Sequence, residues 1–448
     1  MPAILCKRSE ELQISMSRIR VLSVALMILA ISLASVTFAQ DKTVAELVAE
    51  TPELSTFNSL ATQAGLSLTG TVYAPTDEAF AAWPQFVTDY VTANPELLAS
   101  ILNYHIAAEG SVLTIATAED GTVSVDNATV TTADLTASDG TLNIIDTVLL
   151  PEITLPEVIP ADVTGSLVLA GSSTVFPISQ TIASDFAAEG FAGEITADSI
   201  GTGAGFERFC AAEGASDIAN ASRAIKDSEI ESCAANNQRE AVGFRVGDDG
   251  LAVVVNPAND WATDLTSEQL ALAFSTAATW ADIDPSFPTC DIQRWSPGTD
   301  SGTFDFFVES VLEDDSAPLL AASNLNLSED DNILLDGVAS NECAIGYFGF
   351  AYYTENVDRV NLLAIDGVAP SAETVNEGLY GLARPLFIYT APSVIAEKPQ
   401  VGEFVTYYLN RVSDVTPSVG YFLPNAFEFN QSKLVLLAML NAAAPDGM

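Results

Sequence analysis

From residue 165 to the end of the chain, short strand-like apolar runs alternate with longer helix-like stretches. The expected strands cover residues 167–170, 194–200, 217–221, 251–256 and 385–390. The expected helices cover residues 177–188, 206–212, 266–275, 303–312 and 401–409, and a further helix is expected to start at Asp227. Strands that alternate with helices predict α/β lobes built on parallel sheets.

Residues 41–155 show a different pattern, with helix-like stretches first and short alternating runs later. Helices are expected at 43–64 and near 95–104, and alternating runs at 122–125 and 127–131. This order predicts a separate α+β domain. Prolines at 151, 156 and 160 follow, so residues 156–164 are expected to form an extended, semi-rigid linker.

Three hydroxyl-rich turns each lie between a strand-like run and a helix-like run, at residues 171–177, 201–205 and 298–304. A small-residue turn before a helix presents free backbone N–H groups and the positive end of the helix dipole, which suit a tetrahedral anion. One such turn is a weak signal, because ordinary loop–helix junctions share it. Three turns at the carboxyl ends of strands predict one anion site.

The chain has 448 residues, of which 48% are hydrophobic. This is enough for sizeable cores in two or three domains, and it argues against disorder. The formal net charge is −44. Such a charge opposes binding to nucleic acid and to anionic membrane surfaces. The strongly negative charge is equally consistent with adaptation to high salt and with descent from a family of acidic proteins.

The first 39 residues have the features of an export signal. Arg18 and Arg20 precede the apolar run 21–36, and the small residue Ala39 follows. The run is short for a membrane span, so a cleaved signal is favoured over a membrane anchor. We expect cleavage after Ala39, with Met16 as an alternative start, and a periplasmic or cell-surface protein. No cysteine lies at the cleavage site, so a lipid anchor is not expected.

Loss of the signal, which contains Cys6, leaves Cys210, Cys233, Cys290 and Cys343. An even number of cysteines in an exported chain predicts two disulfides, for which three pairings are possible. The cysteine spacings do not match a zinc site, and a single histidine in the chain excludes a His-ligated metal centre. A Ser-His-Asp triad would need that histidine, which lies in the first domain, so neither an enzyme nor a cofactor is expected.

The segments TVYAPTDEAF, ILNYHIAAEG and NIIDTVLLP follow one another within residues 41–155. Their order and spacing resemble the fasciclin domain. The resemblance implies a β-rich wedge that often contacts an extracellular matrix or a cell surface. Tyr104 and His105 match the Tyr-His pair of the family, and we interpret His105 as a hydrogen-bonded structural residue.

Six further segments follow in order after residue 165: GSSTVFP, SIGTGAGFERFC, DIANASRAIK, GTDSGTFDFF, IGYFGFAYY and LARPLFIYT. Together they resemble the PstS family, the phosphate-binding proteins of ABC importers. The resemblance implies a two-lobe α/β fold of the type II periplasmic-binding-protein kind, with lobe 1 at about 165–248 and 378–448 and lobe 2 at about 249–377. It also implies capture of inorganic phosphate by hinge closure and its presentation to a membrane permease.

The resemblance carries the phosphate contacts mainly onto the three turns. The expected ligands are Ser173, Thr174, the Val175 backbone, Thr202, Ser222, Ser301, Gly302 and Thr303. Arg208 and Arg294 are weaker candidates for a phosphate contact and are expected to be structural.

Two positions depart from the family pattern. Ser222 stands where many members have an aspartate, and Pro297 stands where many have an arginine. Arg223 is therefore expected to supply the cation, because a guanidinium group fits phosphate oxygens, and a surface ion pair is the alternative. Asp300 is expected to accept a hydrogen bond from the proton of phosphate, and a helix cap is the alternative.

The two-lobe interpretation also selects a disulfide pairing. A bridge between lobes would oppose hinge closure, so we expect Cys210–Cys233 in lobe 1 and Cys290–Cys343 in lobe 2. Two alternatives to phosphate capture stay open: a binder of sulfate, molybdate or tungstate, and a cell-surface adhesin with a vestigial anion site.

Overall fold

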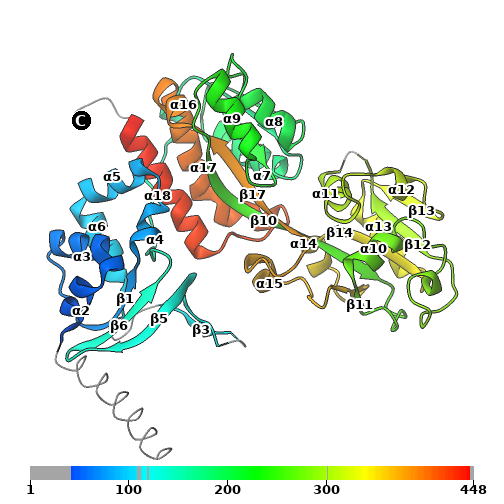
Figure 1. Cartoon of the computed structure of the whole chain (residues 1–448). Coiled ribbons are helices and arrows are strands. Elements are labelled where there is room, and N and C mark those ends of the chain that lie inside the picture. Colours follow the sequence, from blue (N-terminus) through cyan, green and yellow to red (C-terminus); the bar gives the residue numbers. More distant parts are fainter. Residues whose placement is uncertain (1–41, 108–112, 119–120, 300, 444–448) are drawn as a thin grey trace, which may run out of the picture. The chain divides into compact units, whose positions relative to one another are not determined.

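The computed structural model describes residues 42–107, 113–118, 121–299 and 301–443 of the chain (Figure 1). The expected export signal and Asp300 lie outside these residues. The chain divides into two compact units, Met1–Pro151 and Glu152–Met448. Among the described residues, every helix is too short or too polar to span a bilayer.

The first unit combines helices with a six-stranded sheet of order β2-β1-β6-β5-β4-β3. Strands β1 (Gly70–Pro75) and β6 (Gly140–Ile145) run parallel, and the other neighbours are antiparallel. The other strands are β2 (Ile106–Ala107), β3 (Ile115–Thr117), β4 (Val123–Val125) and β5 (Ala128–Thr136). The helices are α2 (Val44–Glu50), η1 (Pro52–Leu54), α3 (Ser55–Gln63), α4 (Asp77–Ala81), α5 (Gln85–Ala93) and α6 (Pro95–Tyr104). The predicted α+β class is confirmed.

The stretch predicted to be helical at 43–64 is helical, and it is divided into α2, η1 and α3 in turn. Thr43 and Glu46 form a capping box that starts α2. Pro52 cannot donate the backbone N–H that would continue α2, and it begins η1 instead.

His105 is fully buried in the first unit and is held by two backbone groups. Its Nδ1 lies 2.8 Å from the carbonyl oxygen of Ile101, and its Nε2 accepts the N–H of Leu149 at 2.9 Å. Burial lowers the pKa of His105 to about 4, so the ring is neutral at pH 7. These contacts support the structural role expected for this residue.

The second unit is built on a nine-stranded sheet of order β13-β12-β14-β10-β17-β9-β7-β8, with β15 paired to β10 beside this path. The strands are β7 (Ser166–Gly171), β8 (Glu194–Ser199), β9 (Ile218–Ala221), β10 (Val242–Val255), β12 (Gln293–Pro297), β13 (Leu325–Ser328), β14 (Ala344–Gly349), β15 (Asn361–Leu362) and β17 (Ala383–Thr390). A separate two-stranded sheet joins β11 (Asp264–Leu265) to β16 (Ala364–Ile365).

Twelve helices accompany these strands in the described part of the second unit, apart from one short 3-10 turn before β7 and another before β12. They are α7 (Phe176–Ala188), α8 (Thr202–Phe209), α9 (Asp227–Asn236), α10 (Ser267–Ala273), α11 (Gly302–Val311), α12 (Ala317–Leu320), α13 (Asp331–Ala339), α14 (Phe350–Thr354), α15 (Ala372–Asn376), α16 (Pro392–Glu397), α17 (Pro399–Ser418) and α18 (Ala426–Ala443).

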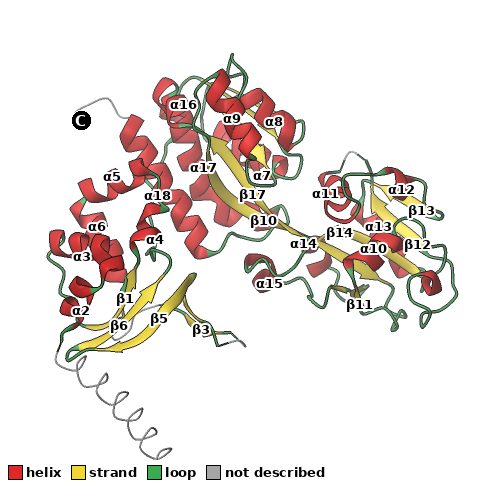
Figure 2. Cartoon of the chain, viewed as in Figure 1, coloured by secondary structure: helices red, strands yellow, loops and turns green. Residues whose placement is uncertain are grey.

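The long antiparallel strands β10 and β17 connect two lobes of this unit (Figure 2). β10 pairs with β17 through residues 242–250 and with β14 through residues 251–255. In lobe 1, β7 runs parallel to β8 and β9, and in lobe 2, β12 runs parallel to β13 and β14. The predicted two-lobe α/β fold with parallel sheets in each lobe is therefore confirmed.

Each lobe contains one disulfide. Cys210 is joined to Cys233, which links the end of α8 to α9 in lobe 1. Cys290 is joined to Cys343, which links the segments before β12 and β14 in lobe 2. These are the two pairs expected from the sequence, and neither bridges the lobes.

The segment predicted as a linker packs along the second unit instead of standing free. The side chains of Ile153, Leu155, Val158 and Val163 are 3–8% exposed. These apolar residues recur every two to five positions, and their burial fixes the segment to the unit. We call residues 152–164 the strap.

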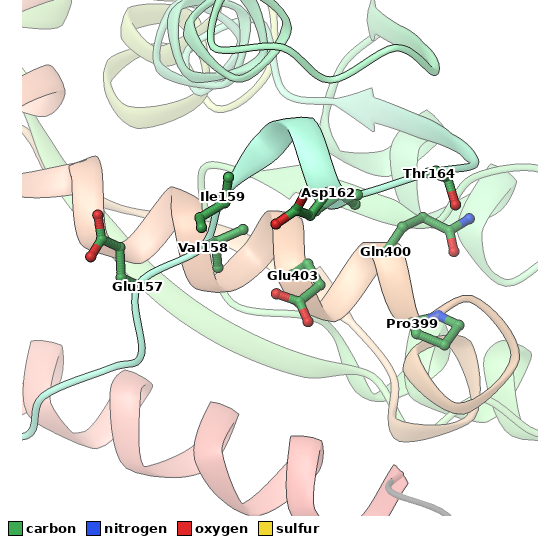
Figure 3. A pocket seen from close by; sticks show the side chains of 9 residues that line it. Glu157, Val158, Ile159, Asp162, Thr164, Pro399, Gln400 and Glu403 are labelled. Carbon is green, nitrogen blue, oxygen red and sulfur yellow. The ribbon is translucent and has the colours of Figure 1, made fainter.

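The strap is also held by hydrogen bonds to two helices. Ile153 donates its N–H to Asn430 on α18, and Asn410 on α17 donates to the carbonyl of Pro156, both at 2.9 Å. A groove of about 460 Å³ lies between the strap and α17. Figure 3 shows side chains that line it, among them the acidic Glu157 and Glu403.

Candidate functional site

The three hydroxyl-rich turns each follow the carboxyl end of a strand and lead into a helix, as predicted. They join β7 to α7, β8 to α8 and β12 to α11. Gly171 and Ser199 are register partners at the ends of β7 and β8, so the first two turns lie side by side. The third turn belongs to lobe 2.

Gly302 brings the third turn against the first. A Cβ atom on Gly302 would lie 2.8 Å from Thr174 Oγ1 and 2.9 Å from Ser173 Oγ, both in lobe 1. Only glycine permits so close an approach between the two lobes. The structure thus gathers the three turns at one place.

Helix α8 starts earlier than predicted, and this matters for the site. It begins at Thr202 instead of at residue 206, directly after Gly201, whose φ is 85°. The backbone of α8 at Gly205 approaches the backbone of Gly171 closely. A Cβ on Gly205 would lie 2.6 Å from it, so this position suits glycine. The N-terminal N–H groups of α8 therefore lie beside the first turn.

A cavity of about 240 Å³ lies where the turns meet, with side chains from both lobes in its wall. Its lining consists of Ser172, Ser173, Thr174, Gly201, Thr202, Gly203, Ser222, Arg223, Lys226, Asp305, Glu309, Asp314 and Arg384.

Five of the predicted ligands line this cavity: Ser173, Thr174, Thr202, Ser222 and Arg223. The Thr202 and Ser222 hydroxyls lie 3.1 Å apart, and the Ser222 N–H donates to Thr202 Oγ1 at 3.2 Å. The start of α8 and the residue that follows β9 therefore present adjacent hydroxyl groups in lobe 1.

Val175, Ser301, Gly302 and Thr303 are predicted ligands that are not among the lining residues of the cavity. Val175 is fully buried, and its N–H donates to Ser172 Oγ at 3.4 Å. Ser301 caps α11 by accepting the Thr303 N–H at 3.2 Å. Ser301, Gly302 and Thr303 thus form the N-terminus of a helix that meets Thr174 of lobe 1.

Arg384 on β17 is a buried cation in the cavity wall, and it is not among the ligands predicted from the sequence. Its side chain is 6% exposed. One guanidinium nitrogen, Nη2, donates to Thr174 Oγ1 and, at 2.9 Å, to the carbonyl of Gly302. The other, Nη1, lies 3.4 Å from Ser222 Oγ. Arg384 therefore contacts groups from both lobes.

Two further groups hold Arg384 in place. Its Nε and Nη2 each lie 3.2 Å from Oδ2 of Asp249, which is 2% exposed. Asp249 and Arg384 are register partners on β10 and β17, so the strand pairing itself sets this contact. The guanidinium also lies over the ring of Phe306, 4.1 Å from its centroid. Burial raises the pKa of Asp249, and the charge of Arg384 opposes this shift.

Arg223 is engaged differently from the prediction. Its two terminal nitrogens donate to the two carboxylate oxygens of Glu229 at 2.9 and 2.7 Å, within lobe 1. Its side chain is 24% exposed. The structure therefore favours the ion-pair alternative for Arg223, and Arg384 is a buried cation in the wall of the cavity.

The two arginines expected to be structural have partners of the expected kind. Arg208 pairs with Asp198, and Arg294 is fully buried and donates to the carbonyls of Ala273 and Ser323. Burial lowers the pKa of Arg294 to about 10. Asp300 lies outside the described residues.

Known proteins match both units of this chain. A family model described as a PBP superfamily domain matches residues 157–412, and the fasciclin domain model matches residues 52–114 and 107–151. Protein SphX of Synechocystis sp. is 38% identical over 285 residues, which cover 61% of this chain and 83% of SphX. The phosphate-binding protein PstS of Staphylococcus saprophyticus is 34% identical over 272 residues, covering 59% of this chain and 82% of that protein.

The chain belongs to the PstS family and carries a fasciclin domain. Its PstS-like unit also resembles the crystal structure of a possible phosphate binding protein from Planctomyces limnophilus. That likeness has a TM-score of 0.56 and 34% identity, and it covers 63% of this chain and all of the other.

The cavity of this PstS-family protein has walls of opposite charge. Arg223 and Lys226 line it from lobe 1, whereas Asp305, Glu309 and Asp314 line it from lobe 2. The buried pair of Asp249 and Arg384 lies between these walls on the connecting strands. The hydroxyl and N–H donors of the turns suit an anion, while the acidic wall stands opposite them.

Proposed function

We propose that this protein binds inorganic phosphate between its two lobes and delivers it to a membrane ABC permease. The observation that carries the proposal is Arg384, a buried cation bonded at once to Thr174 in lobe 1 and Gly302 in lobe 2. The named relatives support it, because PstS proteins are phosphate-binding proteins by name. Catalysis is not part of the proposed function.

In the proposed complex, phosphate oxygens accept hydrogen bonds from Arg384 and from the hydroxyls of Ser173, Thr174, Thr202 and Ser222. Hydroxyl groups can turn toward a ligand, because each has one rotatable donor. The N-termini of α7, α8 and α11 add backbone N–H groups and a favourable dipole. These include the N–H groups at Val175, Gly302 and Thr303. The ligand then joins donors from both lobes, which favours the closed arrangement.

We also propose that Asp300 accepts the hydrogen bond of the phosphate proton. Phosphate carries a proton near neutral pH and sulfate carries none, so a carboxylate beside the anion would disfavour sulfate. The need for such an acceptor follows from Ser222, which is neutral where many family members have an aspartate.

The fasciclin domain is proposed to contact a cell surface or matrix partner, with the whole protein exported to the periplasm or the cell surface. Deletion of residues 41–150 should abolish surface attachment and leave phosphate uptake unchanged. Loss of uptake in that variant would contradict this division of roles.

Isothermal titration of the full-length chain tests the proposed ligand. Phosphate should bind with one site per chain, and sulfate, molybdate and tungstate should compete weakly. Tighter binding of one of these oxyanions would assign a different ligand. A complete absence of binding, with surface attachment retained, would favour the adhesin.

A further inference from the structure

Helix α11 places two carboxylates of lobe 2 on one face, toward the cavity. Asp305 and Glu309 are four residues apart on this helix, so their side chains are neighbours on its surface. Both line the cavity, as does Asp314 after the helix ends. Around an anion site this arrangement is unexpected, because a carboxylate repels an anion.

Arg223, on the opposite wall, is subject to the charges of two glutamates from different lobes. Glu229 of lobe 1 holds it with two hydrogen bonds and raises its pKa the most, against the effect of burial. The charge of Glu309 from lobe 2 raises the pKa of Arg223 further, so this carboxylate acts on the guanidinium from across the cavity. Lys226 stands beside Arg223 on the same wall.

We propose that Glu309 determines phosphate affinity by attracting the Arg223 side of the cavity and so favouring closure of the two lobes over the anion. The proposal rests on phosphate as the ligand. In this proposal Arg223 helps to close the lobes and does not itself bind the anion. Its ion pair with Glu229 and its partly exposed side chain agree with this role. Arg384 remains the cation proposed to bind the anion within the cavity.

The proposal and simple repulsion of the anion predict opposite changes in phosphate affinity for the substitution Glu309→Gln. If Glu309 only repels the anion, Glu309→Gln should bind phosphate more tightly. If Glu309 favours closure, the same variant should bind phosphate about two- to fivefold more weakly, the size expected when an attraction involving an exposed carboxylate is lost.

A double-mutant cycle in the full-length chain, measured by phosphate titration, makes the test specific. Glu309→Gln should weaken binding in the wild-type background and lose this effect in an Arg223→Gln background. Tighter or unchanged binding in the first background, or an equal loss in both, would overturn the proposal.

Glu342→Gln is the matched control. Glu342 is an exposed glutamate of lobe 2, two residues before β14 begins at Ala344. Ala344 pairs with Gln293 at the start of β12, whereas the cavity turn follows the end of β12 at Pro297. The control removes the same charge from the far end of the sheet, and its phosphate affinity should stay as in the wild type.

Lobe separation tests the proposal independently of the ligand. Ile230 on α9 and Leu320 on α12 are about half exposed and lie in different lobes, so Ile230→Cys and Leu320→Cys can carry a pair of dyes. Energy transfer in the ligand-free chain should fall in Glu309→Gln, and an unchanged signal would contradict the closing role. If the wild type fails to bind phosphate, the proposed ligand is wrong, and this measurement still decides the role of Glu309.

Discussion

His105 in the first unit and Arg384 in the second are both buried polar side chains, but their partners differ. His105 uses both ring nitrogens on backbone groups, at 2.8 and 2.9 Å. Arg384 shares its guanidinium among an aspartate, two hydroxyls and a carbonyl beside a cavity. Backbone partners are fixed by the fold, whereas hydroxyls can turn toward a ligand. The first arrangement supports a structure, and the second supports binding.

Removal of the partner of Arg384 should have the largest effect on stability. Asp249→Ala leaves a buried guanidinium without its carboxylate, and we expect the second unit to lose about 3–5 kcal/mol. Denaturant unfolding of the full-length chain measures this loss. Phosphate should stabilise the variant more than the wild type, because the anion supplies the missing negative charge. Equal stabilisation of both proteins would argue against an anion beside Arg384.

Removal of the ring nitrogens of His105 should affect the first unit alone. His105→Phe leaves the Leu149 N–H and the Ile101 carbonyl without their side-chain partner, at a cost of about 2–4 kcal/mol. Phosphate affinity should not change. A parallel loss of phosphate binding would mean that the histidine serves the site as well.

Acid should weaken the first unit through the same histidine. The pKa of His105 falls from 6.5 to about 4 on burial, so below pH 6.5 the unfolded chain takes up a proton that the folded chain does not. The histidine contribution is complete above pH 6.5 and declines as the pH falls toward 4, by up to about 3 kcal/mol. His105→Phe is the control, and its stability should fall less over this interval.

Asp300 should affect selectivity more than affinity. Asp300→Asn keeps the size and the capping ability of the side chain but removes its charge. The preference for phosphate over sulfate should fall by about 1.5–3 kcal/mol, because a charged acceptor of the phosphate proton is lost. Titration with both anions measures the ratio. An unaltered ratio with lower thermal stability would make Asp300 a helix cap.

The three turns were predictable because each is a local pattern. The glycines and hydroxyls of residues 171–177, 201–205 and 298–304 stand between strand and helix within a few positions of one another. The disulfide pairs were predictable as well, since two lobes that move cannot share a bridge. Local chemistry and one functional constraint were enough for these features.

Arg384 was not predictable in the same way. Its partner Thr174 is 210 positions away in the sequence, and Asp249 is 135 positions away. The available signal was a charged residue directly before the apolar run at 385–390, which a buried strand tolerates only with a partner. Arg223 was predicted to supply the cation for phosphate because it is next to Ser222 in the sequence.

The packing of the strap was also not predictable from the sequence, because its partners lie far away along the chain. Its prolines and acidic residues are typical of an extended linker. Its apolar residues are buried, and its backbone is hydrogen-bonded to α17 and α18, which are formed by the last quarter of the chain. Only the fold brings these segments together.

We propose Arg384, and not Arg223, as the cation that binds phosphate. Arg384→Lys and Arg223→Lys both keep the charge and remove the planar fork, so the two variants are matched. In phosphate titrations of the full-length chain, Arg384→Lys should lose about 2–3 kcal/mol, roughly 30- to 150-fold in affinity, and Arg223→Lys should stay within about fivefold of the wild type. The opposite order, with the larger loss in Arg223→Lys, would assign the phosphate-binding role to Arg223 instead.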